Sequence, residues 1–150
     1  MKITPKRINL FMLYNLPLAF IGGVRVCSLT NEEAVVRIKH KWINQNPFKS
    51  MFWAAQGMAA EMSTGVLIMN AIACSNEKIS MLVTQQEANF FKKATGKILF
   101  TCAGGNEISE AIRVSKETKE GQVIVLTSEG KNENGVLVSS FSFEWSLKVK

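Results

Sequence analysis

The stretch from Met51 to Cys74 constrains the fold most, because it carries a single charge, that of Glu61. It is apolar nearly all round, so we expect a helix over about 50–74 that is buried on most sides, with Ser50 as its cap. A carboxylate in its middle would be costly in a bilayer. The stretch therefore predicts a helix buried inside protein, with no membrane span.

Strand patterns lie on both sides of this helix. We expect six strands, over about 24–29, 33–43, 78–91, 96–103, 121–129 and 135–149. The last is the clearest, because Phe141, Phe143, Trp145, Leu147 and Val149 alternate with Ser, Glu and Lys residues. The loop over 130–135 has the Asn and Gly residues of a hairpin. Shorter helices are expected over 5–15, which Pro17 ends, and over 107–117.

A helix that is apolar all round and is followed by consecutive strands has to be covered by the sheet that those strands form. The sequence therefore predicts an α+β fold in which an antiparallel β-sheet wraps around one long central α-helix. The length suits a single domain over residues 1–150, with residues 1–16 as an N-terminal helical extension. A helix that is only half wrapped needs a second subunit to complete its burial, so we expect a homodimer or homotetramer.

The composition excludes several classes of chemistry. All twelve acidic residues are Glu, and the one histidine is His40. Sites with two or three His ligands are impossible, and a catalytic triad would have to use Glu with His40. No phosphate-binding glycine loop is present, so we expect no metal and no cofactor. The three cysteines, Cys27, Cys74 and Cys102, are interpreted as core residues in a reducing compartment, which favours the cytoplasm.

The chain is basic, with a formal net charge of +6. Its basic residues do not interleave with exposed aromatic residues in any common binding motif, so nucleic acid is not an expected partner. One basic stripe, Arg37, Lys39 and Lys41, is expected to be a solvated strand face. His40, on the apolar side of the same strand, is interpreted as a hydrogen-bonded core or interface residue. Phe90, Phe91, Trp53 and Trp145 are also expected in the core.

Residues 46–65, Asn-Pro-Phe-Lys-Ser-Met-Phe-Trp-Ala-Ala-Gln-Gly-Met-Ala-Ala-Glu-Met-Ser-Thr-Gly, resemble the central-helix signature of the hotdog-fold thioesterases. In that superfamily an Asn or Gln precedes the helix, a His-Gly pair often begins it, and a Glu or Asp lies two turns in. Asn46 and Glu61 have the matching spacing of fifteen, whereas Phe52–Trp53 stands where relatives have His-Gly. The runs 91–96 and 143–148 resemble a branch known only as a domain of unknown function, similar to phenylacetate-type thioesterases. The resemblance covers about residues 16–149.

This resemblance implies hydrolysis of an acyl-coenzyme A thioester. Glu61 would activate water or attack the carbonyl itself, and burial would bring the pKa of its carboxyl closer to neutrality. Backbone N–H groups near Phe52 and Trp53 would polarise the carbonyl in place of an imidazole. Asn46 would orient water or the carboxylate, or it is a turn residue before Pro47. Glu61 could instead point to solvent or pair with a Lys at a subunit interface.

Four residues are candidates for substrate binding: Phe52, Thr64, Lys92 and Lys93. Thr64 would bond the Glu61 carboxylate or water, or would bond back to a helical carbonyl. The two lysines would contact the phosphates of coenzyme A, which enters only as part of the substrate, or they end a solvated strand. The alternative function is a non-catalytic acyl- or lipid-binding hotdog protein, which the missing His-Gly pair supports. A dehydratase relative would need His40 in a catalytic role.

Overall fold

A six-stranded sheet and one long helix organise the molecule. The computed structural model describes residues 3–150. Its elements are α1 (Pro5–Asn15), α2 (Pro17–Ile21), β1 (Arg25–Leu29), β2 (Ala34–Lys39), the 3-10 turn η1 (Trp42–Asn44), α3 (Trp53–Ser75), β3 (Ile79–Phe90), β4 (Lys97–Cys102), α4 (Gly105–Thr118), β5 (Gln122–Lys131) and β6 (Leu137–Val149).

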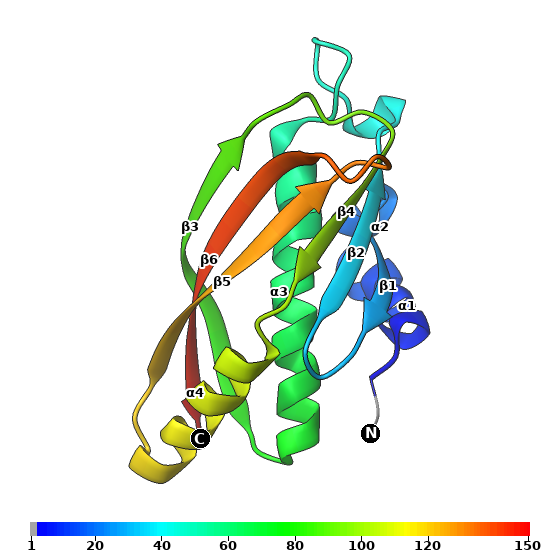
Figure 1. The fold of residues 1–150 in the computed structure, drawn as a ribbon. Coiled ribbons are helices and arrows are strands. Elements are labelled where there is room, and N and C mark those ends of the chain that lie inside the picture. The colour runs from blue at the N-terminus through cyan, green and yellow to red at the C-terminus, as the bar shows by residue number, and fades with distance from the viewer. Residues whose placement is uncertain (1–2) are drawn as a thin grey trace.

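The strands form a single sheet in the order β1-β2-β4-β5-β6-β3, and every neighbouring pair is antiparallel. Figure 1 shows this sheet lying across α3, with α1 and α2 beside β1. The core lies between sheet and helix, where the inward side chains of β6 meet the buried residues of α3. The predicted α+β fold, an antiparallel sheet around one long helix, is confirmed.

The long helix α3 is a core helix. Its length and apolarity would suffice to cross a membrane, but 56% of its most apolar window is buried by the rest of the protein. It begins at Trp53, later than expected, and Asn76 ends it in the left-handed conformation. The predicted cap is wrong: Phe52 holds the cap position without a side-chain bond, and the Ser50 hydroxyl contacts Asn46 instead.

The second strand is shorter than the alternation predicted. β2 ends at Lys39, and Trp42 lies in η1 with 83% of its surface exposed. The cause is buried Asn44, whose amide donates to the carbonyls of Gly22 and Lys39 and accepts from the N–H of Lys41. Three backbone groups satisfied by one side chain outweigh the continuation of the strand. The Nε2 atom of His40 is buried and has no hydrogen-bond partner within residues 3–150.

Helix α2 was not expected, since only α1 was predicted before the first strand. Pro17 ends α1 and, at the first position of a new helix, starts α2. The Asn9 side chain joins α1 to the sheet, because it donates to the carbonyl of Val26 and accepts from its N–H, both at 2.9 Å.

Several residues expected in the core are exposed. Of the four aromatic residues named above, Trp145 is buried, while Trp53, Phe90 and Phe91 are each about half exposed at the start of α3 and the end of edge strand β3. Cys27 and Cys74 are also exposed, so the core interpretation holds only for Cys102. Cys27 lies where the register of β1 shifts, which turns its side chain outward.

The β5–β6 hairpin confirms the predicted turn chemistry. The side-chain Oδ1 of Asn132 accepts from the N–H groups of Asn134 and Val136, both at 3.0 Å. Gly135 has a φ of 74°, which a residue with a Cβ rarely adopts.

Candidate active site

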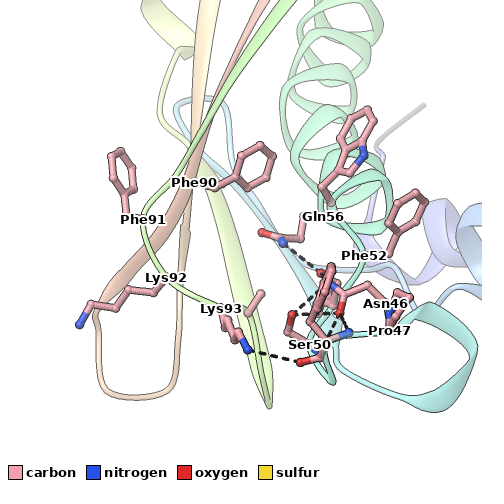
Figure 2. Close-up of a pocket in the computed structure, with 13 residues that line it drawn as sticks. Asn46, Pro47, Ser50, Phe52, Gln56, Phe90, Phe91, Lys92 and Lys93 are labelled. Atoms are coloured by element: carbon pink, nitrogen blue, oxygen red, sulfur yellow. Dashed lines mark hydrogen bonds between the residues drawn. The ribbon is translucent and has the colours of Figure 1, made fainter.

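A cavity of about 510 Å³ opens between the start of α3 and the end of β3. Five of the candidate residues line it: Asn46, Phe52, Trp53, Lys92 and Lys93. Figure 2 shows Asn46, Ser50, Phe52 and Gln56 on one side of the cavity and Phe90 on the other, with its ring directed toward the helix. The wall is mainly apolar, so the cavity suits an apolar group with a polar end.

Asn46 shapes the loop that leads into α3. Its side-chain Oδ1 accepts from the N–H of Phe48 at 2.9 Å and from the N–H of Ser50 at 3.2 Å. Its amide nitrogen donates to the Ser50 hydroxyl at 3.0 Å. These bonds make Asn46 a turn residue, and they hold one wall of the cavity in place.

The first turn of α3 has free backbone donors. The N–H of Phe52 is not among them, because it donates to the carbonyl of Asn44 at 2.8 Å. Within residues 3–150, the N–H groups of Trp53 and Ala54 have no acceptor. Donors at a helix start favour negative charge, so these two can stabilise an oxygen on which charge develops. The free donors are therefore those of Trp53 and Ala54, whereas the sequence predicted those of Phe52 and Trp53.

The two lysines at the end of β3 behave differently. The ammonium of Lys93 lies 3.5 Å from the carbonyl oxygen of Phe48, which links the two sides of the cavity. Lys92 extends away from the helix in Figure 2. Both side chains are exposed. They supply positive charge at the rim of the cavity and none at its base.

Glu61 lies two turns further along α3 and is not part of the cavity wall. It is half-buried, and its carboxylate has no hydrogen bond or ion pair within the part of the chain that the structure describes. Removal from water raises the pKa of Glu61 above its ordinary value of 4.5. A carboxylate without a partner, with a raised pKa, is what a general base needs.

Thr64 is fully buried and fully bonded. Its hydroxyl donates to the backbone carbonyl of Glu61 at 2.9 Å and accepts from the Nε1–H of Trp145 at 3.0 Å. The structure therefore has the bond to a helical carbonyl that the sequence allowed. The Thr64 hydroxyl does not contact the Glu61 carboxylate, and Thr64 does not line the cavity.

The comparison with protein families is decisive. A family model described as a domain of unknown function, DUF4442, matches residues 7–147. The chain belongs to the DUF4442 family. No curated protein matches it in sequence. The predicted relationship to an uncharacterised branch of the superfamily is confirmed.

Solved structures are similar to this DUF4442 chain far more in fold than in sequence. A Pseudomonas aeruginosa protein described as a probable thioesterase is 17% identical, with 99% of each chain covered and a TM-score of 0.84. A Haemophilus influenzae thioesterase is 11% identical over 99% of this chain and 93% of that one, with a TM-score of 0.76. A Staphylococcus aureus protein, solved as an alanine variant, is 15% identical over 89% and 99%, with a TM-score of 0.66. These likenesses establish the hotdog fold.

The sequence did not identify one polar residue in the cavity wall of this DUF4442 chain. Gln56 is buried there, and its carbonyl oxygen accepts from the Ser139 hydroxyl at 2.8 Å. Its amide nitrogen donates to the carbonyl of Met51 at 3.4 Å. The sequence feature that could have identified Gln56 is its position, a polar residue one turn into an apolar helix. Ser139 lies on the distant strand β6, so no local pattern could have paired the two.

Proposed function

We propose that the protein is a thioester hydrolase that acts on acyl-coenzyme A. The observation that carries the proposal is the half-buried Glu61 carboxylate, which has a raised pKa and no partner among residues 3–150. It lies in the same helix whose first turn offers free N–H groups beside an apolar cavity. The thioesterase names of structural neighbours support the same chemistry.

Each group has a role in this proposal. The acyl chain lies in the cavity between Phe52 and Phe90, and its carbonyl oxygen accepts from the N–H groups of Trp53 and Ala54. Glu61 removes a proton from the attacking water, or attacks the carbonyl to form a transient anhydride. Lys92 and Lys93 attract the phosphates of coenzyme A. We place the enzyme in the cytoplasm, where coenzyme A thioesters occur, and coenzyme A enters only with the substrate.

The spacing of Asn46 and Glu61 agrees with that of two altered positions in a structural neighbour. Two of the solved structures are alanine variants of one Staphylococcus aureus protein, one at a glutamine and one at a glutamate fifteen positions further on. Asn46 and Glu61 are also fifteen positions apart. We infer that Asn46 and Glu61 serve the same site, with Asn46 acting through the loop that it holds.

The distance along α3 favours a site shared by two chains. Glu61 follows Trp53 by eight residues, a rise of about 12 Å along the helix. Reacting atoms have to approach to about 3–3.5 Å, and Glu61 does not line the cavity beside the first-turn N–H groups of its own chain, so we infer that a second chain supplies the Glu61 of each site. A two-fold axis near Gly57, half-way between them, brings Glu61 of one copy to Trp53 of the other.

The sheet offers an edge for that second copy. β3 is an outer strand, so one side of its backbone has no partner strand. Leu82 on this strand is 65% exposed, and Met81 and Val83 on its inner side are only half-buried. An unpaired strand edge with apolar side chains favours pairing with another chain. We therefore propose a homodimer, alone or within a homotetramer.

Release of free thiol tests the activity. Wild type and Glu61→Gln are assayed on short, medium, long and aromatic acyl-coenzyme A substrates. We expect turnover in the wild type on at least one class, and a loss of about 10²–10⁴-fold in the variant. Equal turnover in both would remove Glu61 from the mechanism. Saturable binding with no thiol release on any substrate would refute hydrolysis and favour the acyl-binding alternative.

Mixing two inactive variants tests the shared site. Trp53→Pro removes the N–H at a helix position that tolerates proline, and Trp53→Ala is the control that keeps the N–H. Trp53→Pro and Glu61→Gln are each expected to be inactive. Dissociated, mixed and reassociated, they should recover activity, because one site of each mixed dimer has both groups intact. Mixtures that stay inactive while mixed dimers form would contradict a shared site.

A further inference from the structure

A second hollow lies on the opposite face of the sheet from α3. It has a volume of about 330 Å³ and lies over β1, β2 and β4. On these strands the apolar residues face the core, so their neighbours in sequence face outward. Five basic residues and one acidic residue line the hollow: Arg25, Arg37, Lys39, Lys41, Lys97 and Glu133. None of them lines the cavity at the start of α3.

The basic residues face one another across the sheet. Arg25 is the cross-strand partner of Arg37, and Lys39 is the partner of Lys97. Like charges directly opposite each other destabilise a sheet. The one carboxylate of the hollow, that of Glu133, lies 3.9 Å from the Lys97 ammonium at the exposed rim. The positive charge of this face is therefore mostly uncompensated.

Arg25 is held in place before any ligand arrives. Its Nη1 donates to the carbonyls of Phe20 and Val24, both at 2.7 Å, and its guanidinium carbon lies 3.5 Å from the centre of the Phe20 ring. Its Nε and Nη2 have no acceptor within residues 3–150. Burial, and then the positive charge of Arg37, lower the pKa of Arg25 from its ordinary value.

We propose that this hollow binds an anion with two adjacent phosphate groups. Guanidinium groups pair with phosphate oxygens through two parallel hydrogen bonds, and lysines add charge without demanding one geometry. The volume lies at the small end of the range for small-molecule sites. An anion between the opposed pairs replaces repulsion across the strands by attraction. The site is independent of the thioesterase proposal.

Titration calorimetry with pyrophosphate and with monophosphate tests the site in the full chain. Wild type is compared with Arg37→Gln/Lys39→Gln and with a control, Lys148→Gln/Lys150→Gln, that removes the same charge from another exposed region. We expect pyrophosphate to bind at least about tenfold more tightly than monophosphate. The first double variant should lose at least about tenfold in affinity, and the control about twofold or less. No saturable binding, or equal losses in both variants, would overturn the proposal.

Thermal unfolding distinguishes a binding role of Arg37 and Lys39 from a merely structural one. Without phosphate, Arg37→Gln/Lys39→Gln should melt no lower than the wild type, because it removes like charges that face Arg25 and Lys97. Pyrophosphate should raise the Tm of the wild type and leave that of the variant unchanged. A variant that melts lower without phosphate and still responds to pyrophosphate would contradict the assignment.

Vesicles distinguish a lipid headgroup from a soluble ligand. Cosedimentation with cardiolipin vesicles, whose headgroup carries two phosphates, that needs Arg37 and Lys39 and that pyrophosphate reverses would support the site with headgroup phosphates as the source. Pyrophosphate binding without cosedimentation would support it with a soluble diphosphate. Cosedimentation that the double variant retains, with no binding of pyrophosphate, would refute it.

Discussion

The polar side chains of α3 differ in whether they have a partner within residues 3–150: Ser63 and Thr64 bond to the sheet, and Glu61 does not. Toward the sheet, the Ser63 hydroxyl lies 2.7 Å from that of Ser128, and Thr64 accepts from Trp145. The Glu61 carboxylate, one turn before Thr64, is half-buried and has no partner within residues 3–150. Partnered polar groups specify packing, whereas a carboxylate without a partner costs stability. A catalytic role of Glu61 explains why the protein has a carboxylate that lowers its stability.

The largest expected effect is on turnover, which should depend on Glu61 and not on Ser63. Glu61→Gln should lower turnover by about 10²–10⁴-fold, while its free energy of unfolding at pH 7 stays equal or rises, because no charge is buried any longer. Ser63→Ala should leave turnover unchanged and lower stability. Thiol release and urea unfolding on both variants measure the contrast. A Glu61→Gln protein that is strongly destabilised would identify the carboxylate as structural.

A smaller effect is expected from Thr64→Val, which keeps the shape and removes the hydroxyl. The Nε1–H of buried Trp145 would lose its acceptor, so the free energy of unfolding should fall by about 1–3 kcal/mol. Urea unfolding followed by tryptophan fluorescence checks this value. A loss below about 0.5 kcal/mol would mean that the bond contributes little to packing.

The serine pair gives a sharper measure of the sheet-facing side. Ser63→Ala leaves the fully buried Ser128 hydroxyl without this partner and should cost about 1–3 kcal/mol. Ser63→Ala/Ser128→Ala should cost less than the two single changes together, since no hydroxyl is then left unpaired. A double-mutant cycle in urea gives the coupling. Simple additivity would show that the two hydroxyls act separately.

The smallest effect is the pH dependence of stability. Because the pKa of Glu61 is raised in the folded state, that state binds the proton more tightly than the unfolded chain does. The stabilisation is complete below the ordinary pKa of 4.5 and is lost as the pH rises through the folded value. The free energy of unfolding of the wild type, minus that of Glu61→Gln, should therefore fall over this window.

The comparison uses the difference in the free energy of unfolding between wild type and Glu61→Gln, because other carboxylates have lowered pKa values and give the opposite pH dependence. Lys116 lowers the pKa of Glu77, and Arg113 lowers that of Glu110. Their contributions cancel when wild type and variant are compared. A difference that stays constant with pH would contradict a raised pKa at Glu61.

Much of the fold could be predicted from the sequence, because it is set by periodicity. The apolar run of α3 and the strict alternation of β6 decided the architecture, and the hairpin after β5 followed from Asn and Gly residues. The segment from His40 to Trp53 could not be predicted. Its path depends on the buried amide of Asn44, which donates to the carbonyls of Gly22, just after α2, and of Lys39 on β2, and no local pattern identifies these partners.

The candidate site divides in the same way. Glu61 was identifiable as the only acid in an apolar helix. Which N–H groups are free was not, since the carbonyl of Asn44 takes the N–H of Phe52 and leaves those of Trp53 and Ala54. The pairing of Gln56 with Ser139 also needed the folded chain, because those residues lie on α3 and β6.

The most direct test of the central claim is the pH dependence of thiol release at low substrate concentration. If Glu61 is the base, kcat/KM should rise with an apparent pKa above 4.5, and Glu61→Gln should lose this rise together with its activity. A rise at or below 4.5, or the same rise in the variant, would contradict the account and assign the proton transfer to another group.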